Sequence, residues 1–289
     1  MVKRRMTWSL LPGALLFFLL GPTAEARGQD LRDEVTPAYA PAMTCSLETL
    51  KGTYGTLEEG TILGQIPGFP APPFPAVISG VKTFDGAGNF SGTFTASFNG
   101  AIVPGTIKGT YTVSHDCIYS DEFTPSPPAL VFHHVGTITG IGIFQEVHFI
   151  YTDAGVVAYG TFKKAPLSGC SLATLQGTYA VFGQGTVTGS IPGFPPPPLL
   201  FAHNGILTFD GKGKLSGESK EDFDSAIEPE TYTGTYIVNP DCTATATINT
   251  SLGLVIKEAG TITGLGIWME VHTIIANAGW VVADGLKKQ

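Results

Sequence analysis

Two short motifs place an acidic and a basic side chain where they could exchange protons. Glu-Val-His occurs at 146–148 and again at 270–272, each time two residues after an aromatic side chain. Because side chains alternate between the two faces of a β-strand, each glutamate shares a face with its histidine. The candidate acid–base residues are Glu146, His148, Glu270 and His272. Facing a cavity, such a pair suits proton transfer or polar-ligand binding; facing solvent, it is a charge contact worth less than about 1 kcal/mol.

The remaining histidines do not predict a metal site. His133 and His134 are adjacent, so in a strand they point to opposite faces and cannot bind the same ion from that strand. The second copy has Lys257 and Glu258 near the corresponding positions. We therefore expect neither a metal nor a cofactor.

A proline-rich segment is the second candidate for function. Residues 66–75 recur as residues 191–200, and such a segment forms a stiff, extended excursion between strands. Its Phe69 and Phe194 either form a lip that contacts a ligand or partner, or fold back to plug their own barrel. With the aromatic residues before the Glu-Val-His motifs, the candidate ligand contacts are Phe69, Phe144, Phe194 and Trp268.

A tandem duplication must position these residues. Residues 45–54 recur almost unchanged as 170–179, and 136–140 recur as 260–264. A period this long corresponds to a whole domain rather than to a solenoid repeat. We expect one domain at 45–166 and a second at 167–289.

The residue pattern of each copy is all-β. Short runs rich in Thr, Val, Ile, Phe and Tyr are separated by turn sequences such as Asp-Gly-Ala-Gly at 85–88. The strands predicted for the first copy are 51–63, 76–84, 89–98, 105–114, 129–135, 142–152 and 156–163. About seven or eight antiparallel strands favour a small up-and-down β-barrel in each copy, with a sandwich or one fused barrel as alternatives.

The N-terminal residues resemble an export signal. A positively charged stretch at 3–5 precedes an apolar run at 10–20 and a small-residue cleavage pattern at 24–26. The apolar run is short for a membrane span of about 20 residues, so we predict a signal peptide at 1–26, with an uncleaved anchor as the alternative. A flexible segment at 27–44 would follow, and the mature chain, without a membrane span, would be secreted or periplasmic.

Four cysteines occur with the same spacing in both copies. In an exported chain this pattern predicts disulfides, most simply Cys45–Cys117 and Cys170–Cys242, although four cysteines permit three connectivities. The formal net charge of −8 argues against binding nucleic acid or anionic lipid, which requires clustered Lys and Arg.

The order of these motifs resembles that of an uncharacterised family of exported bacterial tandem-repeat β proteins. The shared pattern is GTY, FDGxG, GTYxVxxDC and TDxG, found here at 52–54, 84–88, 109–117 and 152–155. The second copy departs from it with Asn277 in place of Asp153. The resemblance implies export and a β fold similar to lipocalin-like or allene-oxide-cyclase-like barrels, and it implies no reaction.

These observations predict a non-enzymatic exported protein with two barrels, binding a small apolar ligand or a surface partner. The first alternative is an isomerase or cyclase that uses a Glu/His pair inside a barrel. The second is a purely structural envelope module. The sequence leaves the oligomeric state open.

Overall fold

The computed structural model describes residues 44–127, 129–166 and 169–289. The predicted signal peptide at 1–26, and all but the last residue of the predicted flexible segment at 27–44, lie outside these residues. Within the described residues, no helix combines the length and hydrophobicity needed to cross a bilayer.

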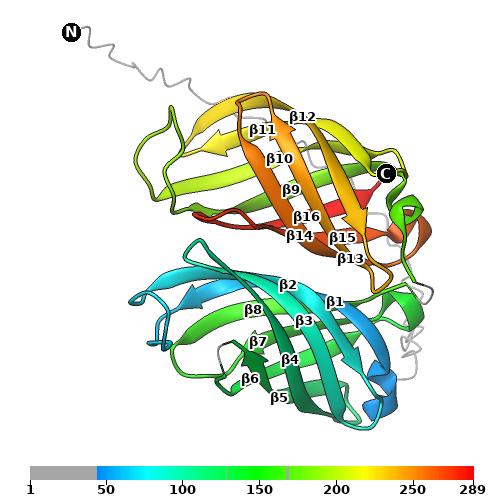
Figure 1. The fold of residues 1–289 in the computed structure, drawn as a ribbon. Coiled ribbons are helices and arrows are strands. Elements are labelled where there is room, and N and C mark those ends of the chain that lie inside the picture. The colour runs from blue at the N-terminus through cyan, green and yellow to red at the C-terminus, as the bar shows by residue number, and fades with distance from the viewer. Residues whose placement is uncertain (1–43, 128, 167–168) are drawn as a thin grey trace, which may run out of the picture. The chain divides into compact units, whose positions relative to one another are not determined.

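Two closed antiparallel barrels of eight strands each follow one another along the chain (Figure 1). Barrel 1 comprises β1 (Gly52–Ile62), β2 (Phe74–Phe84), β3 (Asn89–Phe98), β4 (Ala101–Val113), β5 (Ile118–Ser126), β6 (Phe132–Thr139), β7 (Glu146–Tyr151) and β8 (Val156–Lys164). Barrel 2 comprises β9 (Gly177–Val187), β10 (Leu199–Phe209), β11 (Lys214–Phe223), β12 (Ala226–Val238), β13 (Thr243–Thr250), β14 (Val255–Thr263), β15 (Glu270–Ile275) and β16 (Trp280–Lys288). The predicted duplicated up-and-down barrel is confirmed.

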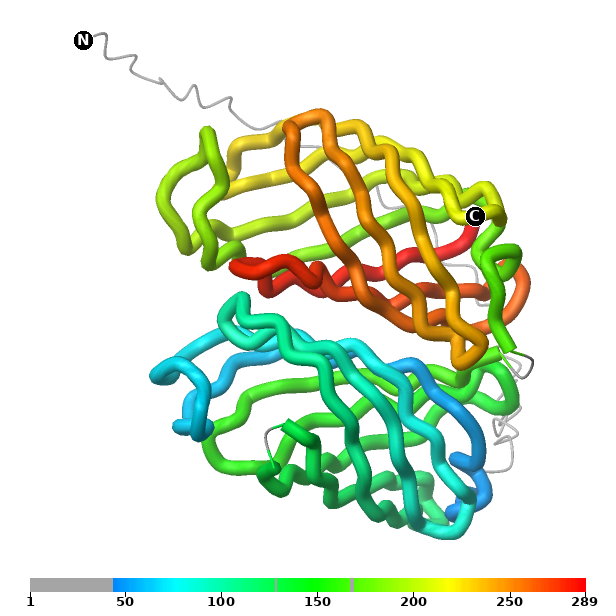
Figure 2. The backbone as a smooth tube through the Cα atoms, viewed as in Figure 1, coloured from blue at the N-terminus to red at the C-terminus, as the bar shows by residue number. Residues whose placement is uncertain are grey.

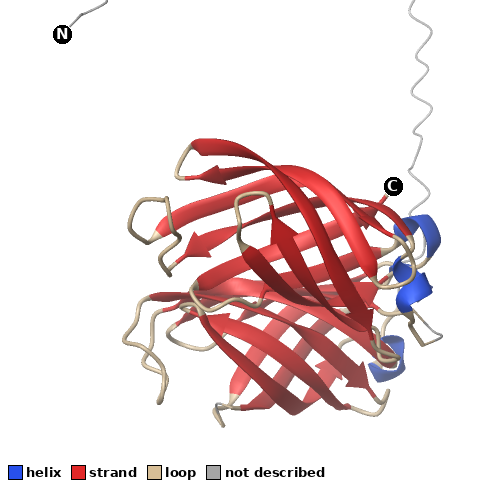
Figure 3. Ribbon diagram, turned by 45° about the horizontal axis from the view of Figure 1, so that its top comes forward, coloured by secondary structure: helices blue, strands red, loops and turns tan. Residues whose placement is uncertain are grey.

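Each barrel closes when its last strand pairs with its first, after a run of hairpins that can be followed in Figure 2. Short 3-10 helices, η1 (Leu47–Leu50) and η3 (Leu172–Leu175), precede the first strand of each barrel (Figure 3). Leu50 and Leu175 are buried there. Both predicted disulfides, Cys45–Cys117 and Cys170–Cys242, tie these ends to the barrels, and they are consistent with an oxidising compartment.

Two parts of the predicted strand pattern were wrong. Strand β5 was missed because Asp121, Glu122 and Pro125 make the segment resemble a loop. The predicted strand at 142–152 begins later, at Glu146, because Phe144 belongs to the 3-10 helix η2 (Gly142–Phe144).

Glycines allow the narrow barrel to curve. A Cβ added at Gly109 would lie 2.3 Å from the carbonyl oxygen of Glu122, and one added at Gly92 would lie 1.9 Å from that of Val81. No side chain fits at such distances, so these strand positions require glycine.

Candidate functional site

The strand alternation carries charged side chains into barrel 1. On β1, Tyr54 and Ile62 belong to the barrel core, and Glu58 shares their strand face. On β2, Phe84 is a core residue, and Lys82 shares its face. Glu58 and Lys82 are therefore both buried, at 4% and 1% exposure.

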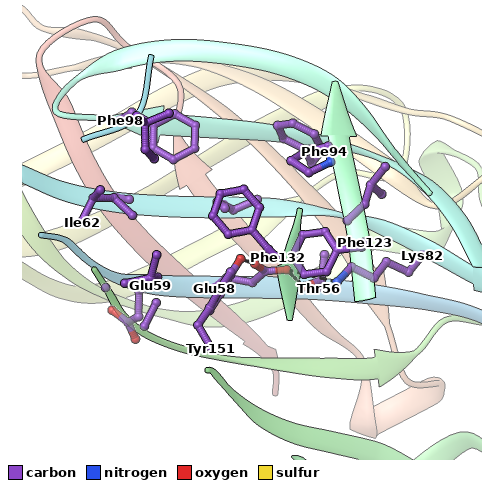
Figure 4. A pocket seen from close by; sticks show the side chains of 18 of the residues that line it. Thr56, Glu58, Glu59, Ile62, Lys82, Phe94, Phe98, Phe123, Phe132 and Tyr151 are labelled. Carbon is purple, nitrogen blue, oxygen red and sulfur yellow. Dashed lines mark hydrogen bonds and ion pairs between the residues drawn. The ribbon is translucent and has the colours of Figure 1, made fainter. Parts of the chain in front are cut away.

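These two residues line a cavity of about 60 Å³. One buried water needs roughly 10–15 Å³, so the cavity has room for more than a single water. Figure 4 shows Ile62 and Phe98 at one end of it, with Lys82 and Phe123 toward the other. The lining is thus mainly aliphatic and aromatic. Lys82, Thr56 and Glu58 form a polar group toward one end, and Glu59 lies near Ile62 at the other.

Glu58 is the acceptor at the centre of that polar group. Thr56 donates a hydrogen bond to Glu58 over 2.9 Å, Tyr151 donates a second, and Lys82 Nζ lies 3.6 Å from Glu58 Oε1. Burial acts to raise the pKa of Glu58, but the Lys82 charge and these hydrogen bonds outweigh it, so the pKa is lowered. Glu58 is therefore ionised at neutral pH.

A second buried carboxylate, that of Asp121, lies in the same barrel. Asp121 accepts hydrogen bonds from the Tyr119 hydroxyl and from the backbone N–H of His134, whose Nδ1 lies 3.1 Å from Asp121 Oδ1. Burial acts to raise the pKa of Asp121, but His134 outweighs it and the pKa is lowered. Burial and the Lys82 charge lower the pKa of His134, which leaves that imidazole neutral.

Lys82 is surrounded by aromatic rings. Its Nζ lies 4.2 to 5.6 Å from four ring centroids, those of Phe162, Phe123, Phe90 and Phe149. These are cation–π contacts, but a ring face does not replace a hydrogen-bond acceptor. Among the described residues, Nζ of Lys82 has no hydrogen-bond partner.

Barrel 2 has filled the corresponding space. Phe201 and Trp280 stand where barrel 1 has Ala76 and Val156, and they pack together with ring centroids 5.4 Å apart. The cavity that remains beside them measures about 20 Å³.

The charged residues of barrel 1 are also absent from barrel 2. The positions of Lys82, Glu58 and Asp121 are occupied there by Leu207, Gly183 and Ala246.

The polar residues inside barrel 2 come from different positions and are mainly acidic. His203 Nε2 lies 2.9 Å from Asp284 Oδ1; burial acts to lower the pKa of His203, but Asp284 outweighs it and raises the pKa to about 9. Burial together with a hydrogen bond to Glu230 raises the pKa of Glu221 to about 8. Burial together with the Asp284 charge raises that of Glu258 to about 8. The two copies thus differ in the charged residues that they bury inside their barrels.

The predicted acid–base pair of barrel 1 lies outside the lumen. Glu146 and His148 lie on the outer face of β7, with His148 Nε2 3.2 Å from Glu146 Oε2 and half of the His148 side chain exposed. Their neighbours Val147 and Phe149 fill the core instead. The interpretation that this motif faces the barrel lumen is therefore wrong. Apolar side chains of β7 occupy the inner face, and Glu146 and His148 form a surface contact.

Glu270 and His272 also lie on an outer face, but one that contacts barrel 1. Ser79 Oγ donates a 3.0 Å hydrogen bond to the His272 carbonyl oxygen, and Lys163 Nζ lies 2.6 Å from Glu270 Oε2. Burial acts to raise the pKa of Glu270, but hydrogen bonds from His272 and Lys163 outweigh it and lower the pKa to about 2. Lys163 also lies 3.1 Å from Glu146, so the two motifs meet at one lysine.

Lys163 is expected to stabilise this junction modestly. Replacing it with Met keeps the packing of its alkyl chain but removes the cation between two carboxylates, so Lys163→Met should lower the free energy of unfolding by about 1 kcal/mol. Urea titration at low and high salt measures the change, which should shrink as salt rises. The control Lys287→Met removes a more exposed partner, 3.4 Å from Glu270, and should cost less. Equal effects of the two substitutions would contradict this role.

The predicted aromatic contacts occupy two different environments. Phe144 and Trp268 are exposed on η2 and η4 (Gly266–Trp268), with ring centroids 5.9 Å apart, and do not line the cavity, because each 3-10 turn lies outside the barrel wall. Phe69 packs against Phe98 with centroids 4.8 Å apart, and Phe194 against Phe223 at 4.4 Å. The proline-rich loops thus fold back onto their own barrels.

Glu58 and Lys82 were missed by the sequence reasoning, although their strand phase relative to Tyr54 and Phe84 carried the signal. Among the described residues, no group of three or more His, Cys, Asp or Glu side chains is arranged to hold a metal ion. No known protein family matches the sequence, and no curated protein matches it either. The resemblance to exported bacterial repeat proteins therefore stays a prediction.

Proposed function

We propose that the chain is an exported, non-enzymatic binding protein whose barrel 1 holds a small, mainly apolar molecule. The observation that carries the proposal is the cavity of about 60 Å³ in barrel 1, at positions where barrel 2 is filled by larger side chains. Apolar lining with a few polar groups is the usual chemistry of small-molecule sites, and the volume of this cavity suits a molecule about as large as a few waters. The disulfides and the N-terminal signal pattern support secretion or periplasmic export.

An isomerase or cyclase that uses a Glu/His pair lacks support from the geometry. Glu146 and Glu270 lie on outer faces with their histidines, away from the cavity. The geometry therefore supports ligand binding in the cavity better than catalysis by these Glu/His pairs. Docking of a surface partner and a purely structural role are the outcomes that the following experiment separates from ligand binding.

Filling barrel 1 as barrel 2 is filled should abolish binding. The double variant Ala76→Phe/Val156→Trp introduces the two side chains that occupy the equivalent space in barrel 2, and it should remain folded because that packing already exists there. Native mass spectrometry of protein exported by its own host should show an added mass on the wild type that denaturation releases. The variant should carry none.

The matched control is Val157→Trp. Val157 is 63% exposed on the outer face beside Val156, so this change adds the same ring without entering the cavity. It should leave the added mass in place. If wild type, variant and control all carry no ligand, the binding proposal fails and a structural module is favoured; if all three carry one, the site lies elsewhere.

A further inference from the structure

The deep end of the barrel 1 cavity contains a cation without an acceptor. Lys82 is 1% exposed, lines the cavity, and has no hydrogen-bond partner for Nζ among the described residues. A buried ammonium group carries three N–H donors, and leaving donors unsatisfied is costly. Figure 4 shows the nitrogen end of Lys82 directed toward Glu58 and Thr56, where the polar part of the lining is found.

The charges around Lys82 decide which kind of acceptor fits. Glu58, 3.6 Å away, already supplies one negative charge, and Asp121 supplies a second within the same core. Since His134 is neutral, the cluster of Lys82, Glu58 and Asp121 has a formal charge of about −1. A ligand carboxylate would add a third negative charge in a region of low dielectric constant, which is unfavourable. A neutral oxygen acceptor adds none.

The rest of the cavity constrains the remainder of the ligand. Between Lys82 and the other end, the lining is formed mainly by hydrocarbon side chains, among them Ile62, Ile78 and Phe98. These side chains offer burial of apolar surface and no charge pairing. Glu59 also lines the cavity near Ile62, but its carboxylate accepts a hydrogen bond from the exposed Tyr159 hydroxyl. The complementary molecule has one polar end and an uncharged hydrocarbon body.

We propose that barrel 1 selects a neutral molecule with a carbonyl oxygen, which accepts a hydrogen bond from Lys82 Nζ while its hydrocarbon part lies toward Ile62 and Phe98. This inference rests on the proposed binding function and narrows the ligand class. Glu58 acts as the counter-charge that excludes carboxylates, so the pair distinguishes ketones, aldehydes and esters from fatty acids. No covalent step is involved.

Three small probes with the same number of non-hydrogen atoms suit a cavity with room for a few waters: 2-butanone, its alkene isostere 2-methyl-1-butene, and propanoate. Methyl NMR signals of Ile62, Ile78 and Ile107, which line the cavity, report binding directly. We expect 2-butanone to bind about tenfold or more tightly than the alkene, because a hydrogen bond to a charged group is gained. Propanoate should bind more weakly than 2-butanone. Equal binding of ketone and alkene, or tighter binding of propanoate, overturns the inference.

Two variants assign the selectivity to the pair. Glu58→Gln should improve propanoate binding about tenfold relative to 2-butanone, because the competing negative charge is gone. Lys82→Met, in which Glu58 still accepts from Thr56 and Tyr151, should bind ketone and alkene equally, because the ammonium donor is absent. An unchanged preference in both variants contradicts the role of Lys82. If no probe shifts the isoleucine signals of any variant, the proposed binding function itself fails, which is a distinguishable result.

Discussion

Glu258→Gln is expected to stabilise barrel 2 by about 4 kcal/mol at pH 8 while changing its stability little at pH 4. Burial and the nearby Asp284 charge raise the pKa of Glu258 to about 8, so the native carboxyl is protonated where the unfolded one is ionised. From about pH 4.5 to 8 the unfolded state binds fewer protons than the native state. Stability therefore falls as the pH rises through this window.

Glutamine resembles the protonated carboxyl in shape and has no proton to lose, so the variant avoids this loss of stability.

The groups around Glu258 also make barrel 2 less stable as the pH rises. Burial raises the pKa of Glu221 to about 8, and Asp284 raises that of His203 to about 9, so wild-type barrel 2 should lose stability progressively from about pH 5 to 9. Barrel 1 should behave oppositely, because its Glu58 and Asp121 have lowered pKa values and lose their stabilising charge in acid.

Tryptophan emission during urea unfolding provides the measurement. Among the described residues, the tryptophans are Trp268 and Trp280, both in the second copy, and Trp280 is buried inside barrel 2. The control Glu218→Gln changes an exposed carboxyl on β11 and should stay within about 0.5 kcal/mol of wild type at every pH. A Glu258→Gln effect of equal size at pH 4 and pH 8 would show that ionisation is not its cause.

Duplication, hairpin turns and cysteine spacing were sufficient to predict two barrels, each with its own internal disulfide, because each of these signals is local or repeated. Strand β5 escaped because Asp121 and Glu122 suggest a loop, whereas the barrel buries Asp121 and pairs it with His134 from the next strand. That pairing depends on closure of the barrel and has no local signature.

The candidate site was harder to predict for a related reason. Period-two alternation groups side chains by face but does not state which face is inside, so Glu146 and His148 could be assigned to either. The large aromatic side chains show which face points inward. Glu58 lies on the same face of its strand as the core residue Tyr54, and Lys82 lies on the same face as Phe84. The alternation pattern does not predict the size of the cavity in barrel 1. That size depends on Ala76 and Val156 being small.

Lys82→Met is expected to destabilise barrel 1 by about 3–5 kcal/mol, the usual result of leaving a buried ion without its partner. Methionine is unbranched like lysine, lacks only the terminal ammonium group in length, and can pack among the same phenylalanine rings, so lost volume contributes little. The cost arises at Glu58, which keeps its hydrogen bonds from Thr56 and Tyr151 but loses the nearby cation. The exposed Lys108, changed to Met, is the matched control on β4 and should have almost no effect.

The second substitution separates charge from packing. Adding Glu58→Gln to Lys82→Met should recover most of the lost stability, because the amide leaves no uncompensated charge. Its oxygen can accept from one of the two hydroxyls while its NH2 group donates to the other, and replacing a buried ion pair is often neutral or stabilising. Hydrogen exchange of peptides from β1 to β3 measures this within barrel 1. If the double variant is as unstable as Lys82→Met alone, packing of the lysine chain rather than the ion pair holds this region together. Recovery would instead imply that the pair is retained at a cost in stability, as expected for residues that select a ligand.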